Sequence, residues 1–431
     1  MKFAATGDSI IVVPIPEEHA GTDKIAEYIK GADVRITNLE TTVSNYEHFA
    51  SSFSGGDPLT IAPSILNELK RYGFNACGTA NNHSMDFSFA GVLSTIRHLD
   101  EAGWLHAGTG KSLQEASAPA TIPTKEGTVA YLAMTSVYYG NDSGRAGDSH
   151  DGIPARPGVN GLRRTDECLV TREQMDFIRD LAAQTMVNAE EELEQVFGYS
   201  CADTDPDTFS FGTINFRVAD KPGKTSRCNE TDMQRMERAI RNAKMTHRHV
   251  VVSIHCHQFP GRVEHEVDYY LEEFAHRCID AGASAIIGHG NHLLKGIEIY
   301  KGCPIFYCLG NFIFHPEYVS RIPADVVEFF GFSQELTGLE ITEQRKARAT
   351  CSMESNPLCY QSVVPLWEMD GDKLTSITLL PVELGMQEDT GLRGFPSPAD
   401  PQLVIDHLKM VCEPFGTKLE IDGDLIKVVL E

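Results

Sequence analysis

Two histidines follow an apolar run in the stretch Ile286-Ile287-Gly288-His289-Gly290-Asn291-His292. His289 and His292 are three residues apart in a short loop that contains glycine. Such a loop can direct both imidazole rings at one metal ion, because neutral imidazole is a common metal ligand. A buried histidine satisfied by hydrogen bonds is the alternative. The spacing therefore makes His289 and His292 candidate metal ligands.

Other side chains able to bind metal also follow apolar runs elsewhere in the chain. They are Asp8 after the first run, Asn38 and Glu40 after the second, Asn82 and His83 after the third, and His255 and His257 after a fourth. Taken singly, each could be a turn, a helix cap or a buried hydrogen-bonded residue. Together they form the mixture of carboxylate, amide and imidazole that Mn²⁺, Zn²⁺ and Fe²⁺ accept. The combination predicts a site for one or two divalent ions.

The apolar runs that precede these residues are short and β-rich, and they alternate with helical patterns. Strands are predicted over residues 2–6, 34–37, 74–78, 128–136, 250–254, 284–287 and 305–309. Helices are predicted from Pro63 to Gly73, over 92–102 and over 267–281, with glycine near each helix end. This alternation is typical of an α/β domain with helices packed on a largely buried sheet. Ligands bind at the carboxyl ends of strands in such sheets, and the candidate residues lie there.

Two regions depart from this alternation. From about 140 to 245 the chain has loops and two charged helical patterns, 172–197 and 231–245, which we interpret as an insertion beside the site. The insertion is either a solvated elaboration or a substrate lid. From 316 to 431 the sequence predicts strands at 362–368 and 373–382, a helix near 401–412 and a terminal hairpin. We treat this part as a C-terminal extension that completes the same domain.

The charge balance excludes some classes of partner. The chain has 37 Lys and Arg against 61 Asp and Glu, a net charge of -24, which would repel nucleic acid and anionic membranes. No apolar run approaches the roughly 18 residues of a membrane span. The first apolar stretch is interrupted by Asp8 and Pro14, as expected for a strand and not for a signal peptide. Eleven cysteines without a C-x-x-C pair indicate reduced thiols, and a cytoplasmic location is predicted.

Several motifs together resemble the CapA (poly-γ-glutamate capsule biosynthesis) family, a branch of the calcineurin-like metallophosphoesterases. They are Asn38-Leu39-Glu40, Ala80-Asn81-Asn82-His83 with Asp86, His106-Ala107-Gly108, Gly288-His289-Gly290-Asn291-His292, Gly296-Ile297-Glu298 and Leu309-Gly310-Asn311-Phe312. The resemblance covers residues 1–315 and resumes at Arg393-Gly394-Phe395-Pro396. It implies a four-layer α/β/β/α sandwich of the calcineurin-like metallophosphoesterase type, with a dimetal centre, a helical insertion and a C-terminal appendage.

The resemblance also implies a role for each candidate residue. Asp8 and His292 would bind the first metal, Glu40 would bridge both metals, and Asn82, His255 and His289 would complete the second site. His83 would be an acid or electrostatic stabiliser held by Asp86.

This sequence departs from the family pattern at a few positions. Ile10 stands where the phosphoesterases usually have a metal-binding histidine, so the first site has one protein ligand fewer. His257 and Lys295 add groups for proton transfer or anion binding. His257 is therefore a candidate catalytic residue, and Lys295 and Asn38 are candidate substrate-binding residues.

The predicted function is a metal-dependent hydrolase. A metal-activated water would attack a phosphoester or a poly-γ-glutamate-related substrate. One alternative is metal-assisted proton transfer by His257 or His83, as in a peptide or amino-acid epimerase. The other alternative is a non-catalytic accessory protein of polyglutamate capsule synthesis. The expected partner is thus a small molecule, a peptide or polyglutamate, and the sequence leaves the oligomeric state open.

Overall fold

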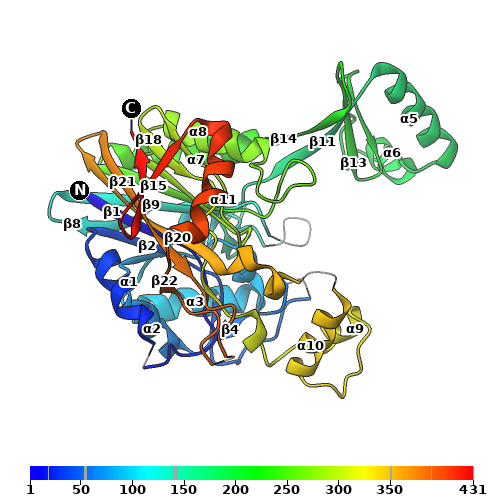
Figure 1. Ribbon diagram of the computed structural model, residues 1–431. Coiled ribbons are helices and arrows are strands. Elements are labelled where there is room, and N and C mark those ends of the chain that lie inside the picture. Colours follow the sequence, from blue (N-terminus) through cyan, green and yellow to red (C-terminus); the bar gives the residue numbers. More distant parts are fainter. Residues whose placement is uncertain (18, 53–55, 139–143, 350–351, 390, 431) are drawn as a thin grey trace.

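A larger and a smaller β-sheet, with helices on their outer faces, form the body of the protein in the computed structural model (Figure 1). The structure describes residues 1–17, 19–52, 56–138, 144–349, 352–389 and 391–430. Gly140, where the insertion was predicted to begin, and Cys351 lie outside the described residues. The prediction of an α/β fold with several sheets and helices is confirmed.

The larger sheet has the strand order β23-β24-β21-β20-β1-β2-β5-β6, and β19 also pairs with β1. Its strands are β1 (Lys2–Ile10), β2 (Val34–Leu39), β5 (Ala76–Gly78), β6 (Leu105–Ala107), β19 (Asn311–Phe314), β20 (Gln361–Asp370), β21 (Lys373–Glu383), β22 (Ser397–Pro398), β23 (Lys418–Asp422) and β24 (Leu425–Val429). The strand β22 pairs with β21. The strands β1, β2, β5 and β6 run parallel, whereas β20 is antiparallel to β1. The C-terminal extension therefore continues the sheet that the N-terminus begins.

The smaller sheet has the order β17-β18-β16-β15-β9-β8. Its strands are β8 (Ala120–Thr124), β9 (Gly127–Thr135), β15 (His249–His255), β16 (Ala285–His289), β17 (Ile297–Tyr300) and β18 (Cys303–Phe306). The strands β9, β15, β16 and β18 are parallel to one another. The carboxyl ends of these central strands consequently lie at one edge of the sheet.

The two sheets pack face to face through a buried aromatic cluster. Trp367 of β20 stacks on Phe3 of β1 at 5.2 Å between ring centroids, and it contacts Phe306 of β18 in the other sheet at 5.4 Å. All of these side chains are inaccessible to solvent. Burial of each large aromatic side chain contributes roughly 1.5–3 kcal/mol, so this interface is a major source of stability. It fixes how the edges of the two sheets meet.

Helices cover the outer faces of both sheets. On the larger sheet, α1 (Gly21–Lys30), α2 (Leu66–Arg71) and α3 (Ser88–Glu101) bury residues such as Ile25 and Leu69. On the smaller sheet, α7 (Glu230–Lys244) and α8 (Tyr269–Asp280) bury Met233 and Phe274. The helix α11 (Gln402–Cys412) packs against the core between the sheets. None of the described helices is both long and apolar enough to cross a membrane.

Part of the predicted insertion projects from the body as a separate lobe, residues 164–228 (Figure 1). The lobe has a sheet of order β12-β13-β11-β14, formed by β11 (Arg164–Val170), β12 (Thr208–Phe211), β13 (Ile214–Val218) and β14 (Gly223–Cys228). The helices α5 (Arg172–Thr185) and α6 (Ala189–Val196) pack beside it. The prediction of a helical insertion was thus incomplete, because these strands are short and partly exposed and lack strong apolar alternation.

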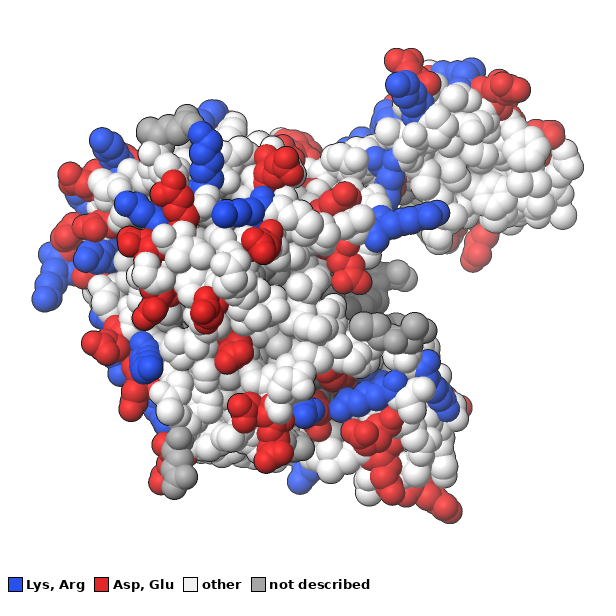
Figure 2. Space-filling view, in the orientation of Figure 1, with Lys and Arg blue, Asp and Glu red and all other residues white. Residues whose placement is uncertain are grey.

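The second charged helical pattern of the insertion, α7, belongs to the body and not to this lobe. Figure 2 shows that acidic and basic residues are mixed over the visible face of the body, whereas much of the visible face of the lobe is uncharged. The lobe also exposes aromatic side chains, including Phe177, Phe197 and Tyr199.

A second projection, within residues 316–360, lies below the lobe on the same side of the view (Figure 1). It contains α9 (Ala324–Phe329) and α10 (Gly338–Arg348). The helix α10 begins at a capping box in which Thr337 accepts from the backbone N–H of Glu340 and the Glu340 carboxylate accepts from that of Thr337. No helix was predicted here from the sequence.

Candidate metal centre

The carboxyl-end edges of the two sheets bring the candidate ligands together. Asp8 lies near the end of β1, and His255 and His289 are the last residues of β15 and β16. Gly290 has a φ of 115°, and a Cβ atom there would lie 2.4 Å from the carbonyl oxygen of Cys256. Glycine is therefore needed at this position, where its N–H donates to Oδ2 of Asp8 at 2.8 Å.

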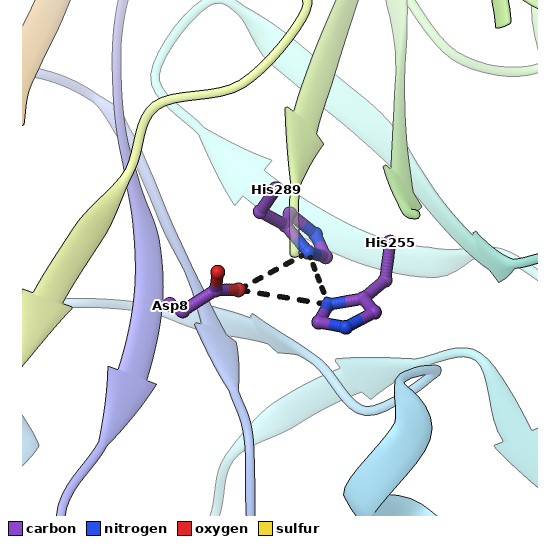
Figure 3. Close-up of side chains that lie close together, drawn as sticks. All are labelled: Asp8, His255 and His289. Atoms are coloured by element: carbon purple, nitrogen blue, oxygen red, sulfur yellow. Dashed lines mark hydrogen bonds and ion pairs between the residues drawn. The ribbon is translucent and has the colours of Figure 1, made fainter. Parts of the chain in front are cut away.

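Asp8, His255 and His289 form a triangle of polar atoms (Figure 3). Oδ1 of Asp8 lies 3.6 Å from Nδ1 of His255 and 3.4 Å from Nδ1 of His289, and these two nitrogens are 2.9 Å apart. Burial raises the pKa of Asp8, but His255, His289 and His292 outweigh burial and hold it well below its usual value. Burial lowers the pKa of His289 to about 3, so its ring is neutral, as a metal ligand must be.

Glu40 provides the sharpest indication of a cation. Its carboxylate is fully buried, and neither oxygen has a hydrogen-bond partner among the described residues. Burial, followed by the charge of Asp8, raises the pKa of Glu40 well above its usual value. Buried carboxylates are ordinarily hydrogen-bonded, paired or bound to metal. Nε2 of His255 lies 3.7 Å from Oε1 of Glu40, so a shared divalent ion between them would satisfy both groups.

His292 is held in a strained backbone conformation with a φ of 59°. Its Nδ1 donates to Oδ1 of Asn311 at 2.8 Å, which leaves Nε2 with the free lone pair. Nδ2 of Asn311 donates to the carbonyl of Cys359, and this contact fixes the amide orientation. From the sequence, Asn311 was recognised only as part of a motif and was given no role, although its position beside the ring makes it an orienting residue.

The described residues include overlapping groups whose ligand atoms lie within 4.8 Å of one another. These groups are Asp8, His255 and His289; Glu40, His255 and His257; and Asp8, Glu40 and His292. The residue types fit hard to borderline divalent ions, and the shared members allow one ion or two. His257, predicted as a proton-transfer group, therefore lies among the candidate ligands, and Asn82 lies beside them in the cavity wall.

His83 lies at the entrance to this cluster. It belongs to a 3₁₀ turn, Asn82–Met85, that Asn81 caps by accepting from the backbone N–H of His83. Its Nδ1 is 2.6 Å from Oδ2 of Asp86, which also accepts from the backbone N–H of Leu59. Asp86 therefore fixes the ring tautomer and directs Nε2 away from itself, to a position 3.9 Å from Oε1 of Glu40.

The two residues predicted to bind substrate have other contacts. Nδ2 of Asn38 donates to Oδ1 of Asp8 at 2.8 Å, and Oδ1 of Asn38 accepts from Asn81. Lys295 is 1% exposed, and its Nζ donates to the carbonyls of Gln258 and Glu266. Asn38 thus orients the candidate ligand Asp8, and Lys295 stabilises the loop that contains Gln258 and Glu266. The structure does not bring either one to the described wall of the neighbouring cavity.

We predict that Lys295→Ala destabilises the fold and leaves the site chemistry intact. The change removes buried packing and leaves the carbonyls of Gln258 and Glu266 without their donor, so the free energy of unfolding should fall by about 2–4 kcal/mol. Chemical denaturation measures this loss. A rise in KM without loss of stability would instead indicate that Lys295 contacts substrate.

A cavity of about 450 Å³ adjoins the candidate metal centre. Asn82, His83, His257 and His292 line one wall. Residues within 316–360 contribute to its lining, including Arg345, Met353, Glu354 and Asn356. None of the described residues of 144–245 lines it. This wall could not be predicted from sequence, because its residues match no motif and lie far along the chain from the ligands.

The fold and the site define a mixed α/β protein with a buried cluster of carboxylates and histidines where two sheets meet. The chain belongs to the bacterial capsule synthesis protein PGA_cap family, whose sequence pattern matches residues 2–316. The predicted membership of the CapA family is confirmed.

Relatives are similar over much of the chain. The protein y4sH of Sinorhizobium fredii is 32% identical over 97% of this chain and 91% of its own length. The capsule biosynthesis protein CapA of Bacillus anthracis is 22% identical over 82% of this chain and 71% of its own. The probable polyglutamine synthesis accessory protein Rv0574c of Mycobacterium tuberculosis is 26% identical over 65% of this chain and 55% of its own.

A crystal structure of a hypothetical protein from Thermus thermophilus aligns with 89% of this chain and 99% of its own. The TM-score is 0.40 and the sequence identity is 10%. A likeness at this level carries no conclusion about function.

Proposed function

We propose that this protein is a metal-dependent hydrolase of the metallophosphoesterase type that acts on a phosphoester or a poly-γ-glutamate-related substrate. The observation that carries the proposal is the buried carboxylate of Glu40, which lies between His255 and His83 and has no hydrogen-bond partner among the described residues. A carboxylate in that position calls for a cation, and the neighbouring Asp8 and histidines supply further ligands. The packing of two sheets between helical layers supports a four-layer sandwich of the calcineurin-like type.

Residues of the chain would act together with bound metal ions in hydrolysis. Bound divalent ions would supply positive charge and a water of lowered pKa. The oxygen of an attacking water would form the new bond to phosphorus and lose its proton to solvent as the bond to the leaving oxygen breaks. His83, held by Asp86, gives the leaving oxygen its proton and regains one from the next water. Asn38 and the backbone N–H of Gly290 donate to the two oxygens of Asp8 and so fix the position of this candidate ligand.

Removal of metal is expected to abolish turnover. Purified protein should contain Mn²⁺, Zn²⁺ or Fe²⁺ by elemental analysis, and it should hydrolyse p-nitrophenyl phosphate or bis(p-nitrophenyl) phosphate. Chelation should remove both metal and activity, and metal addition should restore them. Glu40→Gln keeps the side-chain shape and removes the charge, so it should lose metal and activity together.

Other outcomes would support different functions. A metal-loaded protein that hydrolyses no ester or γ-glutamyl amide would contradict the hydrolase and favour a non-catalytic accessory role; the Mycobacterium tuberculosis relative is named a probable polyglutamine synthesis accessory protein. Uptake of deuterium at a substrate α-carbon, without hydrolysis, would favour an epimerase.

A further inference from the structure

The lining of the cavity also carries opposite charges side by side. Arg345 of α10 forms an ion pair with Asp57, and both side chains line the cavity. The guanidinium lies over the ring of Phe330, 4.7 Å from its centroid, so its plane is fixed from one side. Arginine has five N–H donors, and among the described residues Asp57 accepts from Nη1. A charged fork therefore remains available to a ligand.

This pair lies close to the reacting end of the cavity. A Cβ atom at Gly56 would lie 3.9 Å from Cε1 of His83, and Asp57 is the next residue. Leu59, two residues further on, donates to the Asp86 carboxylate that holds His83. One backbone segment thus contacts the His83–Asp86 pair and positions Asp57. Consecutive Cα atoms are about 3.8 Å apart, so Asp57 lies within one residue's length of the backbone beside His83. A small molecule is long enough to contact both side chains.

The balance of charge on the lining restricts the ligand further. The described lining includes the carboxylates Asp57, Glu264 and Glu354 and the guanidinium of Arg345. A polyanion would be repelled by the carboxylates, and a simple cation would leave the guanidinium without a new partner. A ligand group with a positive and a negative charge close together can pair with the carboxylates and with the guanidinium at once. An ammonium next to a carboxylate has this chemistry.

We propose that Arg345 and Asp57 select substrates whose far end is a free amino-acid head group, with the carboxylate on Arg345 and the ammonium on Asp57. The inference rests on the proposed function, because it places the bond to be broken beside His83. It names the substrate class of that same site: small phosphoesters or amides of amino acids. Guanidinium and carboxylate match as a bidentate pair, which lysine cannot reproduce.

A set of phosphomonoesters separates the contribution of the ligand's ammonium from that of its carboxylate. O-phospho-L-serine carries both charges, phosphoethanolamine the ammonium, phosphoglycolate the carboxylate, and ethyl phosphate neither. The wild-type protein should prefer O-phospho-L-serine in kcat/KM. In Arg345→Gln the ratio of kcat/KM for O-phospho-L-serine to that for ethyl phosphate should fall roughly 10- to 100-fold, the range of a lost charged hydrogen bond. Arg345→Lys should recover only part of this ratio.

Arg348→Gln is the matched control. Arg348 lies on the same helix and stacks over Phe332 at 3.9 Å, but it is exposed and lies outside the described cavity lining. In Arg348→Gln the ratio of kcat/KM for O-phospho-L-serine to that for ethyl phosphate should equal the wild-type ratio. If Arg345→Gln and Arg348→Gln change all the esters equally, or if the wild type shows no preference, the inference is overturned.

Calorimetric binding of the same ligands to the metal-loaded protein keeps this test independent of turnover. Binding that prefers O-phospho-L-serine and depends on Arg345, in a protein that hydrolyses no ester, would uphold the head-group site and reject the hydrolase. Hydrolysis without any Arg345-dependent preference would uphold the hydrolase and reject the head-group site.

Discussion

Replacement of His83 by alanine is expected to lower kcat by about 100- to 10,000-fold, the usual contribution of a positioned acid. The physical reason is geometric: Asp86 holds Nδ1 at 2.6 Å, so the other ring nitrogen is free to serve the substrate at the cavity wall. Metal content should be unchanged, because the candidate ligand groups form without His83. Steady-state kinetics and elemental analysis on the same preparation measure both quantities.

His98→Ala provides a matched control for this prediction. His98 on α3 pairs with Glu101 at the same spacing of three residues, with 3.2 Å between Nδ1 and Oε2, and it lies outside the described cavity lining. Its kcat should equal that of the wild type. A metal-replete His83→Ala protein with wild-type kcat would show that His83 serves only the local turn.

Replacement of His289 by alanine is expected to empty the metal centre while the fold persists. Loss of a residue that merely orients a ligand typically costs 10- to 100-fold in metal affinity, so loss of a ligand itself should cost more than about 100-fold. His289 is the last residue of β16, and Ile286 and Ile287 of the same strand pack into the hydrophobic cores on either side of it. Competition with a chelating dye measures the affinity, and circular dichroism follows the fold.

His249→Ala distinguishes loss of metal from general damage. His249 is also buried on a strand of the smaller sheet, at the opposite end of β15, where its Nδ1 contacts Ser284. This variant should lose stability and keep its metal. Equal metal loss in both variants, or unfolding of His289→Ala, would identify His289 as a structural residue.

The strands that carry the site were predictable from sequence because they are short, buried on both sides and followed at once by polar residues. β2, β15 and β16 match the predicted runs within a few residues. β1 was predicted to end at residue 6 but continues to Ile10, because Asp8 remains in register with Asn311 of β19. The convergence of Asp8, Glu40, His255, His289 and His292 followed from a general rule about strand ends.

The part of the cavity lining that contains Arg345 and Asp57 was not predictable in the same way. Arg345 lies on a helix whose sequence is charged along much of its length, and nothing in its local pattern distinguishes it from Arg348 three residues later. Only tertiary contact with Asp57, nearly three hundred residues earlier, separates the two. Local sequence patterns report which side chains are near in the chain, whereas this part of the cavity lining is formed by side chains that folding brings together.

The projecting lobe begins and ends at neighbouring points of the body. Arg164 and Cys228 are paired across β11 and β14, and the backbone N–H of Asn229 donates to the carbonyl of Arg163. The entropy cost of closing a loop grows only with the logarithm of its length, about 0.6 kcal/mol per doubling. Ser226 and Cys228, at the inner end of β14, contact α8 of the body, whereas Leu169 and Gly223 are paired further out on the same two strands. The segment between Leu169 and Gly223 can therefore be lengthened, shortened or replaced by a short turn with little strain on the body.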